Sequence, residues 1–379
     1  MASTLRKFIQ HNFSSKQNFR FGRNKRKSEN KKDRSMAEKS KSDGKKQGHY
    51  EGSIGDFLAH TWSVERELGQ GTFGKVYLCK NVESGLNCAI KVVRNIPRYT
   101  AAAKIEISIL KNLTRKNHAG YYPIVQLFHD FSFNGHVCLV FPVHGISTYD
   151  YMKSIGYKPY KFNTIKSFCS QLLSALQFLH ANKCTHTDIK PENVLFKSER
   201  PFAESIPGDP KSRRLLTTEI IVVDFGSAVF ETDHHSKTVS TRHYRAPEII
   251  FGQKWGTKID IWSLGCMLFE YYTGDTMFDT HEDLEHLAIM ERYIGAPTTS
   301  IMQKSSSFYQ YNERGYSLKI DWESESGKKA RKGRKPLHAD HNALFDLIER
   351  MLTYDPKIRP DAHTCLNHFL FYQGRFSLK

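Results

Sequence analysis

The chain has 379 residues, of which 39% are hydrophobic and 12% aromatic. This composition predicts a substantial folded core and excludes wholesale disorder. Lysine and arginine outnumber aspartate and glutamate by 56 to 39, for a formal net charge of +17. The apolar runs, such as Ile220-Ile221-Val222-Val223, are strand-sized and far short of the roughly 20 residues of a spanning helix, so we expect no membrane segment.

The positive charge is concentrated in residues 1–48, which hold 15 lysines and arginines against 4 acidic residues. This segment has no sustained apolar period, so we expect a basic tail that is disordered in isolation. Three interpretations remain open: a nuclear import signal around residues 23–32, a mitochondrial presequence, or a solvated tail without a receptor. We expect no secretory signal, because the start contains no apolar core.

The first predicted elements begin at Trp62, where β-branched and polar residues alternate around glycines. Residues 63–82 indicate a glycine-turned hairpin, and residues 85–95 indicate a third strand. Residues 101–113 carry apolar side chains at helical spacing, and residues 136–143 have the pattern of a further strand. We therefore expect a small sheet subdomain with one main helix.

The rest of the chain is mainly helical in pattern. Residues 162–183 form a long amphipathic helix, short strands are expected at residues 190–196 and 219–225, and helical patterns dominate after Ala246. Strands first and helices later indicate two subdomains of different class, an α+β arrangement. The seven cysteines show no CxxC and no metal-knuckle spacing, which predicts free thiols in a reducing compartment.

Two segments interrupt this plan. Residues 199–218 carry three prolines between strand-like runs and indicate an inserted loop or hairpin. Residues 303–336 are polar and contain a basic cluster at 328–335. We interpret that cluster as a solvated loop, with a secondary import signal or an anion-binding patch as alternatives.

Residues 69–76 form a GxGxxGxV pattern. Glycines let backbone N–H groups approach phosphates with no Cβ in the way, although a plain glycine hairpin explains the pattern equally well. A dinucleotide-binding interpretation requires a helix directly after the glycines, whereas a strand from Lys75 is expected here. Further along, Lys91 follows Ala89 in an apolar strand, and Glu106 lies among isoleucines in the predicted helix. Because they follow the glycine pattern in this order, Lys91 fits the role of a lysine that holds phosphates, and Glu106 fits that of a glutamate that orients this lysine.

The strongest single signal is HTDIKPEN at residues 186–193. Asp188 and Asn193 lie in a loop between the long helix and a strand. Three further motifs follow along the chain: Asp224-Phe225-Gly226, Ala246-Pro247-Glu248 and Asp260-Ile261-Trp262-Ser263-Leu264-Gly265. Each motif alone occurs by chance as a capped loop or a turn, but all of them together and in this order indicate a phosphotransferase.

From about Trp62 to Phe371 the chain resembles a eukaryotic protein kinase, and within that superfamily it is similar to the LAMMER, or CDC-like, kinases. The diagnostic segment is EHLAIMERYIG at residues 285–295, where the family has Leu-Ala-Met-Met-Glu-Arg and this chain has Ile289. Its apolar residues recur at helical spacing, so we expect a buried helix face with a folding role. The other similar segments are HTDIKPENVLF, DFGSAVF followed by two histidines, STRHYRAPEII, GISTYDYM and the insert 199–218.

The resemblance implies an α+β, bilobal protein kinase fold with ATP and Mg²⁺ as cofactors. A small antiparallel-β N-lobe with one main helix would span about residues 62–142, and a larger, mainly helical C-lobe about residues 145–371. Pro142 replaces a usual acidic hinge residue but keeps the carbonyl that an adenine amino group needs. Asn193 and Asp224 would hold Mg²⁺. The implied ATP-binding residues are Gly69, Gly71, Gly74, Val76, Ala89, Lys91, Glu106, Phe141, Pro142 and His144.

The resemblance also assigns catalytic roles. Asp188 would accept the proton of the substrate hydroxyl, and Lys190 would neutralise the phosphoryl group during transfer. Thr241 would bridge these two residues, and Arg245 lies with it in the activation segment.

The activation segment, residues 224–248, is short, and Glu248 is expected to form a buried ion pair with Arg359. Many kinases have an arginine before the catalytic aspartate, and it pairs with a phosphate on this segment. Thr187 stands at that position and cannot supply the charge, so we expect activity without activation-segment phosphorylation.

LAMMER kinases phosphorylate arginine-serine-rich splicing proteins and autophosphorylate on tyrosine, so the resemblance implies dual specificity and substrates of that class. Glu192 would lie beside the path of a substrate arginine, and Glu231 and Asp233 could add negative potential. A solvated loop explains Asp233 as well. A kinase-fold scaffold without transfer, and a kinase with unrelated substrates, remain alternatives.

We expect a monomer in the nucleus, with the cytoplasm as the alternative location. We do not expect direct nucleic-acid binding, because the positive charge lies mostly in the tail and no RNA motif with stacking aromatics is present.

Overall fold

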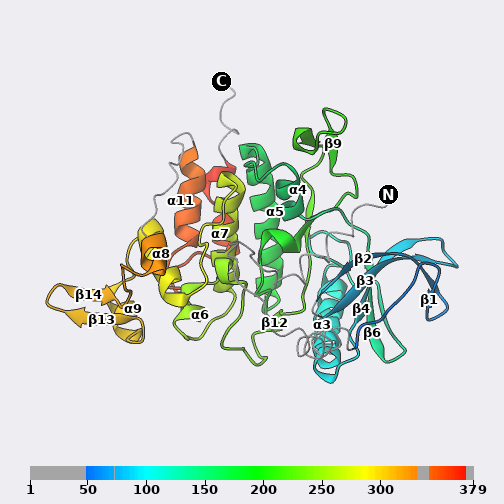
Figure 1. Ribbon diagram of the computed structural model, residues 1–379, viewed down its shortest axis with the longest axis horizontal. Helices are drawn as coiled ribbons and strands as arrows, with labels where there is room; N and C mark the ends of the chain where they lie inside the picture. Colours follow the sequence, from blue (N-terminus) through cyan, green and yellow to red (C-terminus); the bar gives the residue numbers. More distant parts are fainter. Residues whose placement is uncertain (1–47, 72, 331–340, 373–379) are drawn as a thin grey trace, which may run out of the picture.

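The computed structural model describes residues 48–71, 73–330 and 341–372, which form two lobes (Figure 1). The smaller lobe is an antiparallel sheet with one main helix, and the larger lobe is mainly helical. This is the α+β, bilobal architecture predicted from the sequence. The predicted tail 1–48, apart from Gly48, and most of the basic cluster 328–335 lie outside the described residues.

Six antiparallel strands form the sheet of the smaller lobe, in the order β1-β2-β3-β4-β6-β5. The predicted glycine hairpin is β2–β3, and a strand follows the glycines, which excludes the dinucleotide-binding interpretation. Gly74 is required because an added Cβ would lie 2.2 Å from the Val92 carbonyl oxygen. The strands are β1 Phe57–Leu58, β2 Trp62–Gln70, β3 Gly74–Asn81, β4 Asn87–Val93, β5 His129–Phe133 and β6 His136–Pro142.

The chain just before the first predicted strand packs against this sheet, which the sequence did not lead us to expect. The Tyr77 hydroxyl accepts a hydrogen bond from Gly52 N–H (3.3 Å) and lies 3.0 Å from the Tyr50 carbonyl oxygen, to which it donates. The Glu51 carboxylate lies 2.7 Å from the Lys75 ammonium at the end of the glycine loop. This segment therefore adds both β1 and a polar contact to the smaller lobe.

The main helix of the smaller lobe, α3, spans Pro97–Lys116 and extends beyond the predicted residues at both ends. Pro97 stands in the first turn, where its missing N–H has no intrahelical partner to lose and its fixed φ suits a helix start. Arg115 and Lys116 in the last turn complement the helix dipole. The buried residues of α3 include Glu106, and the helix packs against β4 and β6.

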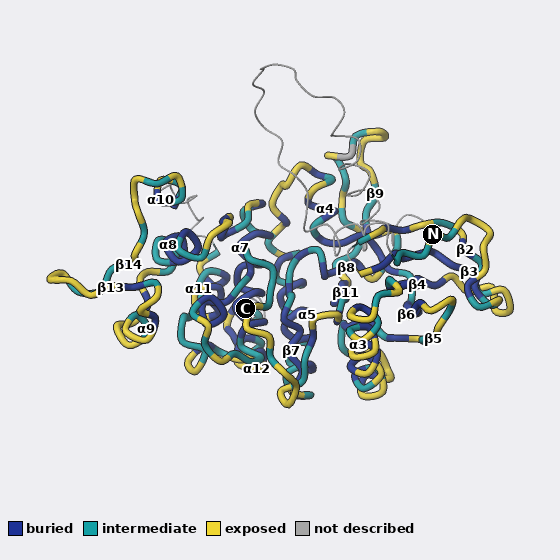
Figure 2. Tube along the Cα trace, turned by 60° about the horizontal axis from the view of Figure 1, so that its bottom comes forward, coloured by how far each residue is buried: buried dark blue, intermediate teal, exposed yellow. Residues whose placement is uncertain are grey.

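The larger lobe is built around α5 and α7. The predicted apolar face of α5 is buried, and α7 is buried on nearly every side, which places both helices at the centre of the lobe (Figure 2). The diagnostic segment 285–295 lies in α8, which buries Leu287, Ala288 and Met290. The helices of this lobe are α4 Thr148–Ser154, α5 Phe162–Ala181, α6 Pro247–Ile250, α7 Lys258–Thr273, α8 Asp283–Ile294, α9 Thr299–Lys304, α10 Glu325–Ala330, α11 Asn342–Met351 and α12 Ala362–Leu366.

Short two-stranded ribbons pair loops of the larger lobe. The pairs β7–β12 and β8–β11 bring residues 186–193 beside residues 223–228, where the predicted catalytic and metal-binding motifs lie. The insert 199–218 is a hairpin, and the polar segment 303–336 contains a second hairpin that was not predicted. These strands are β7 Cys184–Thr185, β8 Val194–Phe196, β9 Phe202–Glu204, β10 Arg213–Leu215, β11 Ile220–Val222, β12 Val229–Phe230, β13 Tyr309–Asn312 and β14 Gly315–Leu318.

The seven cysteines are all free and buried, as their spacing indicated. Burial raises the pKa of Cys138 and of Cys184 to about 12, so these thiols are protonated near neutral pH. Within the described ranges, no helix combines the length and apolarity that crossing a membrane requires.

A buried ion pair fastens the end of the activation segment to the larger lobe. The Arg359 guanidinium donates to both carboxylate oxygens of Glu248, at 2.8 and 2.9 Å, and the two side chains are 0% and 1% exposed. This is the pair expected from the sequence.

Replacing Arg359 by methionine should strongly destabilise the protein, because Glu248 would remain buried without its partner. Removing one member of a buried pair costs about 3–5 kcal/mol. The urea midpoint of unfolding should therefore fall clearly. Arg350→Met, which removes a partner of Asp346 at the exposed surface, is the control and should change the midpoint little. Equal small shifts in both variants would contradict the structural role of the buried pair.

Candidate active site

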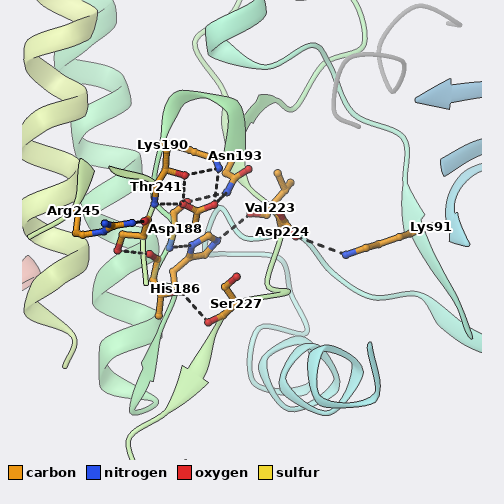
Figure 3. A network of polar contacts seen from close by, with 12 residues as sticks. Lys91, His186, Asp188, Lys190, Asn193, Val223, Asp224, Ser227, Thr241 and Arg245 are labelled. Atoms are coloured by element: carbon orange, nitrogen blue, oxygen red, sulfur yellow. Dashed lines mark hydrogen bonds and ion pairs between the residues drawn. The ribbon is translucent and has the colours of Figure 1, made fainter. Parts of the chain in front are cut away.

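Lys91 of β4 and Glu106 of α3 form the predicted ion pair. The Lys91 ammonium lies 2.8 and 2.9 Å from the two Glu106 oxygens. It also lies 3.7 Å from the Asp224 carboxylate of the larger lobe (Figure 3). Burial alone would lower the pKa of Lys91, but the carboxylates of Glu106 and Asp224 outweigh burial and raise it. The ammonium therefore stays charged at a point where a strand, a helix and the opposite lobe meet.

The glycine loop closes on itself next to this pair. Gly69 and Val76 are register partners on β2 and β3, and Gly71 N–H donates to the Gly74 carbonyl oxygen at 2.9 Å. Val76 is buried in the core of the lobe. The loop thus presents glycine backbone near Lys91, which lies opposite Val76 on the neighbouring strand β4.

The connection between the lobes contains the predicted hinge residues. Phe141 lies opposite Ala89 on the neighbouring strand, and both side chains are buried. Burial lowers the pKa of His144 to about 4, so its imidazole is neutral, and its Nδ1 lies 3.4 Å from the Lys197 carbonyl oxygen. Pro142 is half-buried and lies opposite Cys88 at the end of β6. These residues, expected around an adenine ring, therefore lie together where the start of β4 meets the end of β6.

The loop that carries Asp188 is held by Asp260 of α7. The Asp260 carboxylate accepts the backbone N–H groups of His186 and Thr187, each at 2.9 Å. Thr187 has a φ of 69°, a left-handed conformation that β-branched residues rarely adopt. Its hydroxyl donates to the Ser227 carbonyl oxygen at 2.9 Å. Several hydrogen bonds therefore maintain a strained backbone directly before Asp188, as occurs at functional sites.

Asp188, Lys190 and Thr241 form a closed hydrogen-bond network, as the sequence led us to expect (Figure 3). Thr241 donates its N–H (3.0 Å) and its hydroxyl (2.7 Å) to Asp188 Oδ1, and the Lys190 ammonium lies 2.6 Å from Oδ2. Burial alone would raise the pKa of Asp188, but the Lys190 charge and the bonds from Lys190 and Thr241 outweigh burial and lower it. The carboxylate is therefore ionised and fixed in orientation.

Asn193 and Asp224 offer oxygen atoms suited to a hard divalent cation. The Asn193 amide N–H donates to the Asp188 carbonyl oxygen at 2.8 Å, and its buried Oδ1 has no hydrogen-bond partner within the described part of the chain. Residues 48–71, 73–330 and 341–372 contain no cluster of three or more histidine, cysteine, aspartate or glutamate side chains that could cage a metal. Mg²⁺ commonly takes one or two carboxylates together with substrate phosphates, so this sparse oxygen set fits it.

Arg245 ties the activation segment together through backbone carbonyls. Its guanidinium donates to the carbonyl oxygens of Val239 (3.0 Å) and Ser240 (2.9 Å). The Ser240 hydroxyl in turn donates to the Thr187 carbonyl oxygen at 2.6 Å. Arg245 thus joins the activation segment to the catalytic loop without a phosphate.

An acidic pair beside the catalytic loop was only half predicted. Glu192 was singled out in the sequence, whereas Glu270 of α7 was not. Burial, together with the charge of Glu192, raises the pKa of Glu270 to about 8, against the lowering effect of a 2.5 Å hydrogen bond from the Tyr244 hydroxyl. The signal that could have identified Glu270 is a carboxylate inside the otherwise apolar run CMLFEYY.

Glu231 and Asp233, the other acidic candidates, have local partners. The Glu231 carboxylate lies 3.5 Å from the exposed Lys183 ammonium, and Asp233 accepts the Phe230 N–H at 2.9 Å to close a turn. They do not join the Glu192–Glu270 pair in any described contact.

The site therefore gathers an ionised carboxylate, two charged lysines, a candidate cation site and a glycine loop. Such a set can neutralise a polyphosphate and orient a hydroxyl toward it. The model of the protein kinase domain family matches residues 62–371. The chain belongs to the protein kinase family.

Its resemblance to the LAMMER kinases is also confirmed. It is 40% identical to the dual specificity protein kinase CLK2 of Mus musculus, over 86% of this chain and 66% of that protein. It is equally 40% identical to CLK1 of Homo sapiens, over 86% of this chain and 69% of that protein. The serine/threonine-protein kinase Doa of Drosophila melanogaster is 38% identical, over 86% of this chain and 40% of that protein. The chain spans about two thirds of the length of the CLK relatives.

A solved structure supports the fold independently. The crystal structure of the kinase domain of PF14_0431 matches with a TM-score of 0.77 and 33% identity. The match covers 86% of this chain and 99% of that one. The bilobal architecture is therefore that of a protein kinase.

Removal of phosphate from the activation segment should leave most of the activity. Thr187 offers no cation for a phosphate, and the Arg245 guanidinium is already bonded to backbone carbonyls. Protein expressed in bacteria and treated with phosphatase should keep a transfer rate within about twofold of the untreated protein, with the phosphate content read by mass spectrometry. A strict requirement for a phosphate between residues 224 and 248 would refute this prediction.

Proposed function

We propose that this protein transfers the γ-phosphoryl group of ATP, with Mg²⁺, to serine and threonine hydroxyls of protein substrates, and to its own tyrosines. The observation that carries the proposal is the network of Asp188, Lys190 and Thr241 beside Asn193 and Asp224 (Figure 3). Phosphoryl transfer depends on positioned charge, and the Asp188 carboxylate and the Lys190 ammonium in this network have partners that fix them.

Asp188 would act on the acceptor hydroxyl. Its lowered pKa keeps the carboxylate ionised, and the two hydrogen bonds from Thr241 to Oδ1 set its orientation. A substrate hydroxyl placed within hydrogen-bond reach would be oriented by this carboxylate and would pass its proton to it.

Lys91 and Lys190 would neutralise phosphate charge. Lys91 is held by Glu106 and Lys190 by Asp188, so both ammonium groups are positioned before a nucleotide binds. Preorganised charge of this kind stabilises a transition state without reorganisation during the reaction. Asp224 and Asn193 Oδ1 would hold Mg²⁺, which would supply further neutralisation of the phosphates.

Glu192 and Glu270 would select substrates with arginine near the acceptor. The Glu192 charge contributes to the raised pKa of Glu270 and also to the raised pKa of Lys190, so the Glu192 carboxylate lies within electrostatic range of both side chains. A guanidinium between the two carboxylates would relieve their repulsion and stabilise the ionised form of Glu270.

The substrate class follows from this preference and from the family. We propose arginine-serine-rich splicing proteins as substrates and the nucleus as the location, with the basic tail 1–48 as the candidate import signal. The protein is proposed to act as a monomer.

Lys91→Met, Asp188→Asn and Asp224→Asn should each lower the transfer rate by at least about 100-fold. Each substitution removes a charge that the proposal assigns to phosphate, hydroxyl or metal. The measurement is phosphate incorporation from labelled ATP, with thermal unfolding as the control for folding. Asp224→Asn with near-normal activity would exclude the metal assignment.

Arginine-serine peptides should be phosphorylated better than matched acidic peptides, and added salt should reduce the difference. At pH 9, where both carboxylates are ionised, Glu192→Gln and Glu270→Gln should each raise KM for the arginine peptide by roughly tenfold, because each removes a negative charge that would face the guanidinium. Glu231→Gln, which changes an exposed carboxylate paired with Lys183, is the matched control.

Because the pKa of Glu270 is raised, the preference for arginine peptides should depend on pH. Near pH 7 Glu270 is mostly protonated, and it ionises as the pH rises through about 8, while arginine stays charged. KM for the arginine peptide should therefore fall between pH 7 and pH 9, and this fall should be absent in Glu270→Gln. Equal turnover of acidic and arginine peptides at low salt would rule out the proposed selection of arginine by Glu192 and Glu270.

A further inference from the structure

A cavity of about 530 Å³ lies between the insert hairpin β9–β10, helix α4 and the start of α5. No aspartate or glutamate is among its lining residues, whereas five cationic side chains are: Lys158, Lys161, Lys211, Arg213 and Arg214. We propose that this cavity binds phosphorylated residues of the protein chain that the kinase acts on. This proposal rests on the proposed protein-kinase function, and it adds a second substrate contact outside the active site.

Arg213 is the most firmly held cation of the cavity. Its guanidinium lies 4.6 Å from the centre of the Phe202 ring, and its carbonyl oxygen accepts the Tyr151 hydroxyl of α4 at 2.9 Å. Its terminal nitrogen is 3.5 Å from the Glu204 carboxylate, and its buried Nε has no hydrogen-bond partner within the described residues. The ring and the hairpin thus hold the guanidinium, and the bond from α4 fixes the Arg213 backbone, so this cation has a set position in the wall of the cavity.

The other four cations line the same cavity. No ion pair of Lys158, Lys161, Lys211 or Arg214 occurs among the described residues, and all four side chains are exposed. Lys161 stands at the N-cap of α5, whose first turn contains no acidic residue, so the helix dipole adds to the positive potential. A concave site of one sign concentrates ligands of the opposite sign.

The cavity lies one short helix away from the catalytic loop. The Thr148 hydroxyl, in the first turn of α4, donates to the Pro191 carbonyl oxygen at 2.8 Å, and the Tyr160 hydroxyl donates to the Thr148 carbonyl oxygen at 2.7 Å. Tyr151 and Tyr160 line the cavity on the other side, and Figures 1 and 2 both place the hairpin beside α4. A helix is about 10 Å across, which about three or four extended residues span.

The occupant follows from charge and size. A phosphoserine carries a charge of about −1.5 to −2 and three acceptor oxygens, and arginine binds phosphate through two parallel hydrogen bonds. A cavity of about 530 Å³ holds a few side chains but not a nucleic-acid duplex or a membrane surface. A substrate with repeated serines would, after its first phosphorylation, carry such a residue a few positions from the next acceptor.

Fluorescence polarisation with the full chain tests the proposal. Two labelled peptides of one sequence are compared, one with serine and one with phosphoserine at two positions. Their Kd values are measured for the wild type, for the cavity variant (Lys161→Glu with Arg214→Glu) and for a control variant with Lys104→Glu and Lys116→Glu on α3. We expect the phosphopeptide to bind at least about tenfold tighter than the serine peptide, and we expect that difference to vanish only in the cavity variant. If the charge reversal impairs folding, a second, milder cavity variant, Lys161→Gln with Arg214→Gln, replaces it. This variant should also reduce the difference in Kd between the two peptides.

Turnover of the unphosphorylated peptide separates this proposal from the proposed function. The cavity variant should keep that turnover, whereas failure of the kinase assignment would show as no turnover in any variant while peptide binding is still measured. Equal affinity for both peptides, or a phosphopeptide preference that survives in both cavity variants, would overturn the proposal. Tighter binding of single-stranded RNA or of phosphatidylserine vesicles than of the phosphopeptide, lost in the cavity variant, would assign the cavity to a different partner and also overturn it.

Discussion

The ion pair between Lys91 and Glu106 is the contact on which the arrangement of this kinase depends. Its two side chains are 8% and 6% exposed, so neither charge could be accommodated without the other. The pair holds α3 against the sheet at one angle, and the Lys91 ammonium reaches Asp224 of the larger lobe. A helix, a strand and the Asp224 segment of the larger lobe are therefore placed relative to one another by one lysine.

The larger lobe supplies the complementary constraint. Asp260 holds the backbone before Asp188 in a strained conformation, and Thr241 and Lys190 fix the carboxylate from the other side. Arg245 closes the activation segment through backbone carbonyls. The candidate catalytic groups are thus held in place by contacts within the chain.

The sequence predicts most of this site because phosphoryl transfer restricts the residue types at a few ordered positions. The order of motifs along the chain was enough to place the glycine hairpin, Lys91, Glu106 and the Asp188–Asn193 loop. Their contacts in the structure agree with those expectations. Glu270 was missed because its significance lies in a neighbour, Glu192, from a distant part of the chain. No local pattern encodes such a contact.

The same reasoning explains what was missed in the fold. Strand β1 has two residues and forms only because β2 offers an edge, and the hairpin β13–β14 lies in a segment whose polar composition resembles a loop. The cavity beside the insert depends on α4, α5 and the hairpin meeting in space. Its cations are scattered over residues 158–214, and none of them forms a motif.

Phosphorylation of an arrayed peptide library by the bacterially expressed protein, with Asp188→Asn as the blank, tests the central claim most directly. It reports transfer and sequence preference in one measurement. The account predicts incorporation into serine and threonine peptides with arginine near the acceptor, and none in the blank. Incorporation no greater than in Asp188→Asn would contradict a preassembled active kinase.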